Sequence, residues 1–301
     1  MGSPSRRVRV SCVAGTHRVW VGVVCAVAGM LVLAGEESRA ASNLLAPAED
    51  VSFKTVVEAE TTARLLAVLL DSGRNVINEN LLIAGPQSAG VNLSTSPAAG
   101  RAEGERALLG APVLSPALTA SLFERQLAET FLIRSGVDIR SLGSSRLSPR
   151  ARTLLRQLTE MSKAVVTEAH AATASDAGPP SVHLIPAIFG SQVAKEFAKT
   201  TGVRLKQTAA VPRNPANAPD EFERWVLREF AEPGYQREKV IAEATAESKV
   251  LRLMFPLYAT RHCLVCHGEP RGEIDQMGYV KEGLKLGQNA GAISVVIPMN
   301  P

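Results

Sequence analysis

The sequence predicts a protein of the α+β class, with a helix-rich N-terminal half and a C-terminal half that adds a β-sheet. Three long segments before residue 180 carry apolar residues at three- and four-residue steps, the spacing of amphipathic helices. Three shorter segments after residue 200 are rich in β-branched residues or alternate apolar with polar residues, as strands do. Apolar residues make up 46% of the chain and aromatic residues only 4%, so the core must consist mainly of Leu, Val, Ile and Ala.

The N-terminal half, taken as residues 45–180, is expected to contain three helices. They cover residues 48–80, 118–135 and 148–174. Gly136 predicts a left-handed cap at the end of the second helix. Ser148 and Pro149 are typical of the start of the third, with a capping side chain followed by a proline in the first turn. Residues 84–110 are rich in Gly, Ser, Ala and Pro and are expected to form a loop.

The C-terminal half, residues 181–301, is expected to mix helices with strands. The predicted helices are 185–201, which Gly202 ends, and a helix that Asp220 caps and that runs to Phe230. The predicted strands are 203–206, 250–258 and 292–297. Between them, residues 212–219 contain three prolines and predict a rigid loop.

The first forty residues have the pattern of a secretory signal peptide. Arginines come first, and Val19 to Gly35 is an uninterrupted apolar run. Ser38 and Ala40 are suitable small residues for cleavage before Ala41. The run is near the lower limit for spanning a bilayer, about 17–25 residues, so a retained N-terminal anchor is the alternative. Either way, the protein is expected to be periplasmic or otherwise extracytoplasmic, and membrane-bound only if this segment is retained.

The basic charge of the chain is concentrated in this leader. The whole sequence has a net charge of +4, from 33 basic and 29 acidic residues. The first forty residues hold five arginines and two glutamates, so the remainder has 28 basic and 27 acidic residues, a net charge of +1. Because no basic stripe remains in the body of the protein, the composition argues against a nucleic-acid partner.

The cysteines point to a cofactor. Cys12 and Cys25 lie in the leader, so the exported body keeps only Cys263 and Cys266, which precede His267 in a Cys-Leu-Val-Cys-His sequence. This is the pattern of covalent haem attachment, in which the two thiols add to the two vinyl groups on one edge of the porphyrin. The histidine is then held beneath the iron as its ligand, and its other ring nitrogen is expected to donate to a backbone carbonyl or a carboxylate. One covalent haem is therefore predicted.

Two other uses of these cysteines remain open. A structural zinc site needs four ligands, and without a second cysteine pair it would have to recruit His170, His183 or His262. A thioredoxin-like redox pair is the other alternative, although that motif lies between a strand and a helix near the start of a domain. The absence of other cysteines in the exported body and the predicted export both favour haem.

Residues 184–301 resemble the c-type haem family of periplasmic PAS-like domains, first catalogued as a domain of unknown function. The matching segments are 184–189, 201–208, 213–220, 256–258, 263–268, 278–279, 281–283 and 291–295. Residues 60–175 match more loosely, mainly through 74–80. The resemblance implies a PAS-like antiparallel sheet with flanking helices, a haem at its face, and a sensory or redox role. Many relatives continue into a membrane segment and a signalling module, whereas this chain stops at Pro301, so a separate redox or signalling protein partner is expected.

Several residues are candidates for the surroundings of the haem. His183 and Met254 are candidates for the second axial ligand, because histidine and methionine are the usual choices, and an open or water-bound iron is equally compatible with the sequence. Arg213, Arg204 and Lys206 lie in family-like segments and are candidates to bind the haem propionates, since arginine forks suit carboxylates. Other possible ligands are Met161, His170 and Met277.

Three functions are compatible with this site. The first is a haem-based sensor of redox state or small gas ligands, and the second is an electron carrier between membrane complexes. The third, a peroxidase-like enzyme, needs an open iron and a distal base. The sequence contains no phosphate-binding glycine loop and no nucleophile elbow, so no catalytic residues are predicted.

Overall fold

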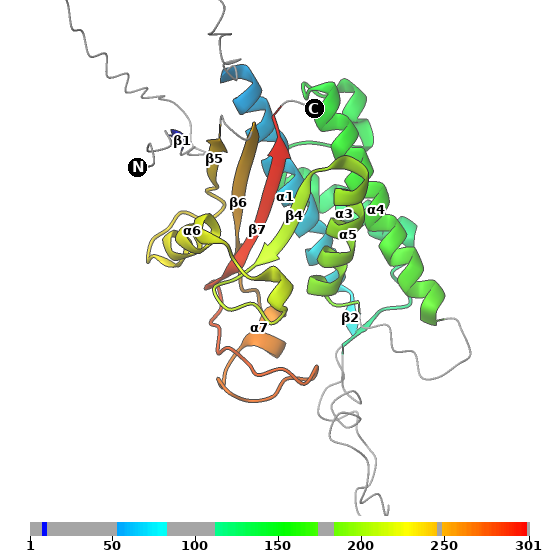
Figure 1. The fold of residues 1–301 in the computed structure, drawn as a ribbon. Helices are drawn as coiled ribbons and strands as arrows, with labels where there is room; N and C mark the ends of the chain where they lie inside the picture. Colours follow the sequence, from blue (N-terminus) through cyan, green and yellow to red (C-terminus); the bar gives the residue numbers. More distant parts are fainter. Residues whose placement is uncertain (1–7, 11–52, 83–111, 174–183, 246–248, 300–301) are drawn as a thin grey trace, which may run out of the picture.

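The computed structural model describes residues 8–10, 53–82, 112–173, 184–245 and 249–299. Its central element is a five-stranded antiparallel sheet in the order β1-β5-β6-β7-β4, with helices on both faces (Figure 1). The strands are β1 (Val8–Val10), β4 (Arg204–Thr208), β5 (Ile241–Thr245), β6 (Val250–Tyr258) and β7 (Asn289–Pro298). A separate pair joins β2 (Leu81–Leu82) to β3 (Val113–Leu114).

Helices account for most of the N-terminal half. The helices are α1 (Phe53–Glu79), α3 (Ala120–Ser135), α4 (Pro149–Thr173), α5 (Pro186–Thr201), α6 (Glu221–Ala231) and α7 (Cys263–His267). Two short 3-10 helices, η2 (Ile139–Ser144) and η3 (Pro215–Asn217), connect them. No helix within the described ranges is both long enough and apolar enough to cross a bilayer.

The ends of these helices follow from particular residues. Gly136 and Gly202 adopt left-handed conformations, with φ of 72° and 71°, and each donates its backbone N–H to a carbonyl of the last helical turn. Asp220 and Glu223 form a reciprocal capping box at the start of α6. The predicted helix ends are therefore confirmed at these positions.

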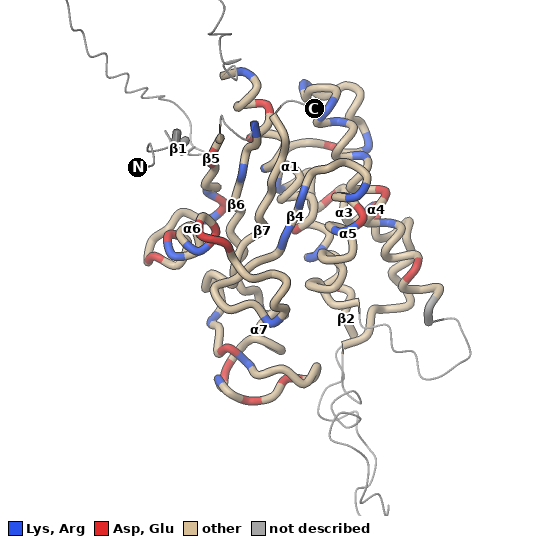
Figure 2. Tube along the Cα trace, in the orientation of Figure 1, with Lys and Arg blue, Asp and Glu red and all other residues tan. Residues whose placement is uncertain are grey.

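The two faces of the sheet are covered unequally. Along β6, Leu251, Leu253 and Phe255 face the main core, which α1 and the helices packed on it complete. Met254 points to the opposite face and joins a smaller apolar cluster beneath α6. Basic residues lie along β4 and β6, and acidic residues lie in the segment after α7 (Figure 2). Because α6 is short, part of this outer face stays uncovered.

The predicted α+β class, with an antiparallel sheet, flanking helices and a helical N-terminal half, is confirmed. Strand β5 was not predicted. Val8–Val10, which the sequence assigns to the leader, pairs with β5 as strand β1. The loop predicted over 84–110 lies outside the described residues, as does His183.

Candidate functional site

The Cys-Leu-Val-Cys-His segment forms a short helix at one end of the sheet. It lies in the long connection between β6 and β7, below the sheet in Figure 1. Two backbone hydrogen bonds tie the two ends of this connection together: Ala259 N–H to the Gln288 carbonyl at 2.9 Å and Gly287 N–H to the Ala259 carbonyl at 2.8 Å. The segment between them is thus a closed loop anchored on two central strands, and we call residues 260–287 the motif loop.

Both cysteines of the motif are free thiols. Cys263 and Cys266 are half-buried, and the Cys263 Sγ lies 3.2 Å from the Thr260 Oγ1. Burial raises the pKa of the Cys266 thiol, and the nearby carboxylate of Asp275 raises it further. Among the described residues, no group of three or more His, Cys, Asp or Glu side chains is arranged to hold a metal ion. The motif helix therefore carries two partly accessible thiols that are not joined in a disulfide.

The imidazole of His267 is held by a carboxylate. Its Nδ1 lies 2.8 Å from the Glu282 Oε2, and its side chain is 40% exposed. An ionised carboxylate can only accept, so this contact places the ring proton on Nδ1 and leaves the Nε2 lone pair available. A carboxylate that fixes the tautomer of a histidine in this way is typical of metal-ligating histidines.

Arg213 joins this pair to the rest of the loop. Its guanidinium contacts both Glu282 oxygens, with Nε–Oε1 at 2.6 Å and Nη2–Oε2 at 3.0 Å, and its Nη1 lies 2.5 Å from the Asp275 Oδ2. Nη2 also donates to the Cys266 carbonyl at 2.8 Å. Such a bidentate pair fixes both charge and geometry. Burial alone would raise the pKa of the Glu282 carboxyl, but the hydrogen bonds from Arg213 and His267 lower it, so Glu282 remains ionised.

The motif loop is ordered by a buried aspartate. The Asp275 side chain has no exposed surface, and its Oδ1 accepts the backbone N–H groups of Met277 and Tyr279 at 2.8 and 2.9 Å. Leu284 N–H donates to the His267 carbonyl at 2.7 Å and attaches the far side of the loop to the motif helix. The histidine and its partners are therefore positioned by several independent contacts.

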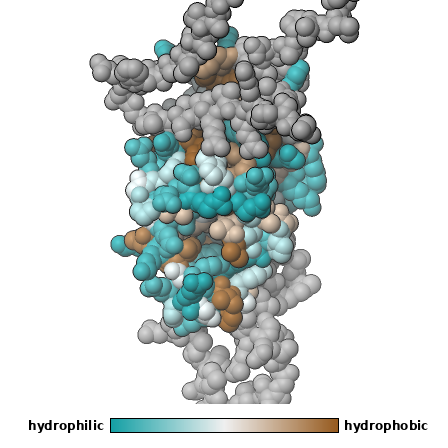
Figure 3. Space-filling view, turned by 60° about the vertical axis from the view of Figure 1, so that its left-hand side comes forward, coloured by the Kyte–Doolittle hydropathy of each residue, from teal (hydrophilic) through white to brown (hydrophobic). Residues whose placement is uncertain are grey.

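The motif loop exposes several apolar side chains. They are Ile274, Tyr279, Val280 and Leu286, which are 61%, 49%, 56% and 60% exposed. Figure 3 shows hydrophobic residues among hydrophilic ones at the lower end of the described surface, the end at which this loop lies. Apolar residues gathered around a polar centre are typical of a surface that contacts a cofactor or a partner.

The predicted site residues lie in three different places. Arg213 is at the motif. Arg204 and Lys206 line a cavity whose wall includes no residue of the motif loop, and Lys206 Nζ pairs with the Glu223 Oε2 at 2.6 Å. Met254 has no exposed surface and packs in the apolar cluster beneath α6. The roles predicted for these residues stay predictions.

The sequence did not predict Glu282 and Asp275 as site residues. The sequence predicted that a backbone carbonyl or a carboxylate would bind the second nitrogen of His267. It did not indicate which residue, because Glu282 is fifteen residues away and several other acidic residues also follow the motif. The one signal was the position of Glu282 in a family-like segment, 281–283.

The fold and the site together define a class: an α+β protein in which a Cys-X-X-Cys-His helix is clamped at the end of an antiparallel sheet. The chain belongs to the Tll0287-like family, whose model, described as Tll0287, matches residues 54–298. The crystal structure of the cyanobacterial heme-protein Tll0287 is similar at 23% sequence identity, over 50% of this chain and 92% of that chain, with a TM-score of 0.33. The comparison with curated proteins finds no match.

Proposed function

We propose that this chain is an exported protein that binds one haem covalently, through thioether bonds to Cys263 and Cys266, with His267 as an axial ligand. The observation that carries the proposal is the His267–Glu282 contact of 2.8 Å, which leaves Nε2 free on the same short helix as two free thiols. Membership of a family in which one protein is described as a heme-protein adds support. The extracytoplasmic location follows from the leader pattern, and it fits the covalent attachment proposed here.

The residues of the chain have separate tasks in this proposal. The cysteines fix the porphyrin edge, and Glu282 holds the His267 ring in the tautomer and orientation that ligation needs. Arg213 keeps Glu282 ionised and ties it to the Cys266 carbonyl, so the ligand and its anchor move together. Ile274, Val280 and Leu286 offer apolar surface to a porphyrin. When bound, the haem supplies one-electron redox chemistry and a metal centre for small gas ligands.

We further propose that the protein is a PAS-like sensor of redox state or of small gas ligands. The support is the connection between Arg213 and the axial histidine, because Arg213 belongs to the proline-rich loop that leads into α6. A change at the ligand of the iron would be passed through Glu282 to that loop and thus to the outer face of the sheet. Its output would go to a separate signalling partner.

Electron transfer is the second candidate function. It is favoured by the exposed apolar side chains around the motif, which would suit the transient docking of a redox partner close to the haem edge. The two functions differ in the state of the iron. A sensor of gases needs a coordination position that a ligand can take, whereas an electron carrier works best with both axial positions occupied.

Expression in a host able to mature c-type cytochromes, followed by absorption spectra, tests these proposals. A covalently bound pigment should form in the parent protein and in a Cys12→Ala/Cys25→Ala control, but not in a Cys263→Ala/Cys266→Ala variant. A colourless parent protein would overturn the haem proposal. Rapid binding of carbon monoxide or nitric oxide by the reduced protein supports the sensor, and an unchanged six-coordinate spectrum with a reversible potential supports electron transfer.

A further inference from the structure

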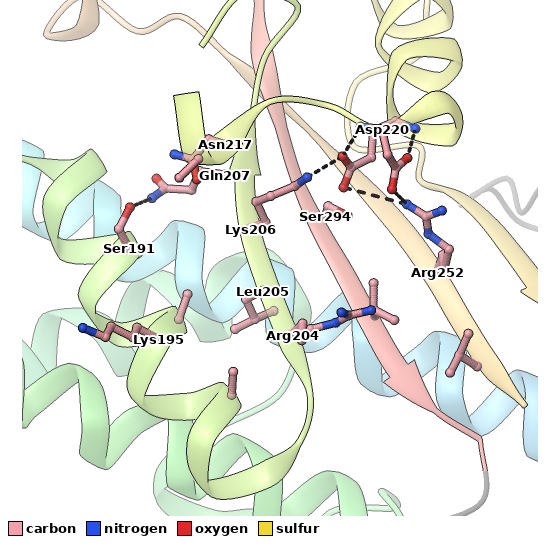
Figure 4. Close-up of a pocket in the computed structure, with 16 residues that line it drawn as sticks. Ser191, Lys195, Arg204, Leu205, Lys206, Gln207, Asn217, Asp220, Arg252 and Ser294 are labelled. Carbon is pink, nitrogen blue, oxygen red and sulfur yellow. Dashed lines mark hydrogen bonds and ion pairs between the residues drawn. The ribbon is translucent and has the colours of Figure 1, made fainter. Parts of the chain in front are cut away.

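The uncovered part of the outer sheet face contains a cavity of about 510 Å³ that is separate from the motif loop. Its walls come from α5, β4, the start of α6, and strands β6 and β7 (Figure 4). Arg204 is the first residue of β4 and lies at the end of that strand far from α7 (Figure 1). A volume of this size is within the usual range of small-molecule sites, about 300–1,000 Å³.

Two arginines flank one valine on this face. The strand register places Val296 of β7 directly between Arg204 of β4 and Arg252 of β6. Since neighbouring strands are about 4.8 Å apart and residues on one cross-strand row point to the same face, the two guanidinium groups project from either side of Val296. Figure 4 shows Arg204 below the charged cluster that includes Arg252, both at the cavity. Val296 forms the apolar floor between them, and Val250, two residues before Arg252 on β6, extends this apolar surface on the same face.

The acidic residues of the cavity already have basic partners. Glu223 is only 2% exposed and pairs with Lys206, with Nζ–Oε2 at 2.6 Å. Asp220 forms an ion pair with Arg252, and hydrogen bonds from the Glu223 backbone and from Arg252 lower the pKa of its carboxyl although burial acts in the opposite direction. These two acids therefore balance Lys206 and Arg252, and the other two basic residues of the wall, Arg204 and Lys195, are left as excess positive charges.

The two arginines differ in their partners. The guanidinium of Arg204 forms no ion pair with any acidic residue in the part of the chain that the structure describes. The Nε of Arg252 is buried and has no hydrogen-bond partner. Because this Nε has almost no accessible surface, a ligand in the cavity cannot reach it, and Arg204 is the arginine that a ligand can engage.

We propose that this cavity binds a small organic carboxylate with an aliphatic chain. The carboxylate lies above Val296, accepts from the guanidinium of Arg204, and places its chain on Val250 and Val296. Arginine forks match a carboxylate in geometry, and the excess positive charge of Arg204 and Lys195 favours a negatively charged ligand. The absence of aromatic residues from the cavity wall favours an aliphatic over a flat aromatic body.

Calorimetric titration of the purified protein with acetate, butyrate and hexanoate tests the proposal. Affinity should increase several-fold from acetate to hexanoate, and 1-butanol, which has no charge, should not bind. Arg204→Gln should weaken butyrate binding about tenfold, a free-energy change of about 1.4 kcal/mol. The control Arg228→Gln removes the same charge from an exposed position of α6 that does not line the cavity, and it should leave the affinity unchanged.

Several results would overturn the proposal. They are no heat of binding with any carboxylate, an affinity for inorganic phosphate equal to that for hexanoate, and an equal loss in both arginine variants. Thermal unfolding of the Arg204→Gln variant without ligand shows whether its fold is retained, which is expected because Arg204 is exposed. If Arg204→Gln proves unstable, the titrations of the parent protein with acetate, butyrate and hexanoate still test the proposal, because an affinity that does not increase with chain length would contradict it. Neither measurement involves haem, so failure here is distinguishable from failure of the proposed function.

Discussion

Replacement of Glu282 by glutamine should raise the reduction potential of the proposed haem. The variant keeps the size of the side chain and a hydrogen-bond acceptor for the His267 Nδ1, which lies 2.8 Å from the carboxylate in the parent protein. It removes the negative charge that makes the imidazole a stronger donor to the iron. Because a negative charge near the iron stabilises the oxidised, more positive state, its removal favours reduction.

The size of the shift follows from the difference between two kinds of hydrogen bond. A bond to a charged group contributes about 1.5–3 kcal/mol and a neutral one about 0.5–1.5 kcal/mol, so the substitution removes about 1.4 kcal/mol. That is a tenfold change in an equilibrium constant, or about 59 mV for a one-electron couple. Glu282 is 34% exposed, and solvent screening makes about 60 mV an upper value.

Spectroelectrochemical titration of the two proteins measures this shift. Glu273→Gln is a matched control, since Glu273 lies in the same loop and pairs with Lys281 at 3.2 Å, but is 55% exposed and has no contact with the histidine. We expect a rise of several tens of millivolts for Glu282→Gln and a much smaller change for the control. Equal shifts in both variants, or a potential that falls in Glu282→Gln, would refute the positioning role of Glu282.

Three further outcomes follow from the packing. Met254→Leu should leave the absorption spectrum unchanged, and a changed spectrum would identify Met254 as an iron ligand. Chemical denaturation should show that the free energy of unfolding falls by less than about 1.5 kcal/mol, because the substitution conserves volume in a buried cluster. Phe189→Ala should lower the free energy of unfolding by about 3–5 kcal/mol, since the ring is fully buried and packs edge-on against Phe123 at 5.6 Å; a loss below 1 kcal/mol would contradict this packing. Burial raises the pKa of Tyr235 from 10.0 to about 12, so the folded protein favours the neutral phenol. This preference stabilises the fold below pH 10 by an amount on the order of 1 kcal/mol after solvent screening, and the stabilisation is lost as the pH rises to 12. Tyr235→Phe should reduce that alkaline loss in thermal unfolding, and an identical pH profile in both proteins would count against the assignment.

The elements that the sequence predicted have local causes. Gly136, Gly202 and Asp220 are capping residues whose effect depends on one turn of backbone, and each ends or begins a helix as predicted. Strand β6 and the strand predicted over 292–297 carry enough β-branched and apolar residues to be predicted as strands from their own sequence. Such features can be read from a window of a few residues.

The elements that were missed depend on contacts across the fold. Strand β5, Ile-Ala-Glu-Ala-Thr, contains two alanines and a glutamate, which have low strand propensity, and its conformation comes from pairing with β6. The partnership of Arg213 with Glu282 joins residues 69 positions apart, and several acidic residues follow the motif. The sequence indicated the motif cysteines and histidine, while the network that holds the histidine needed the three-dimensional structure.

The most direct test of the covalent attachment is the intact mass of the secreted chain after complete unfolding in denaturant. We expect a mass that exceeds that of the polypeptide by one haem, because two thioether bonds survive denaturation. A polypeptide mass without this addition, from a protein secreted by cells that mature other c-type cytochromes, would contradict it.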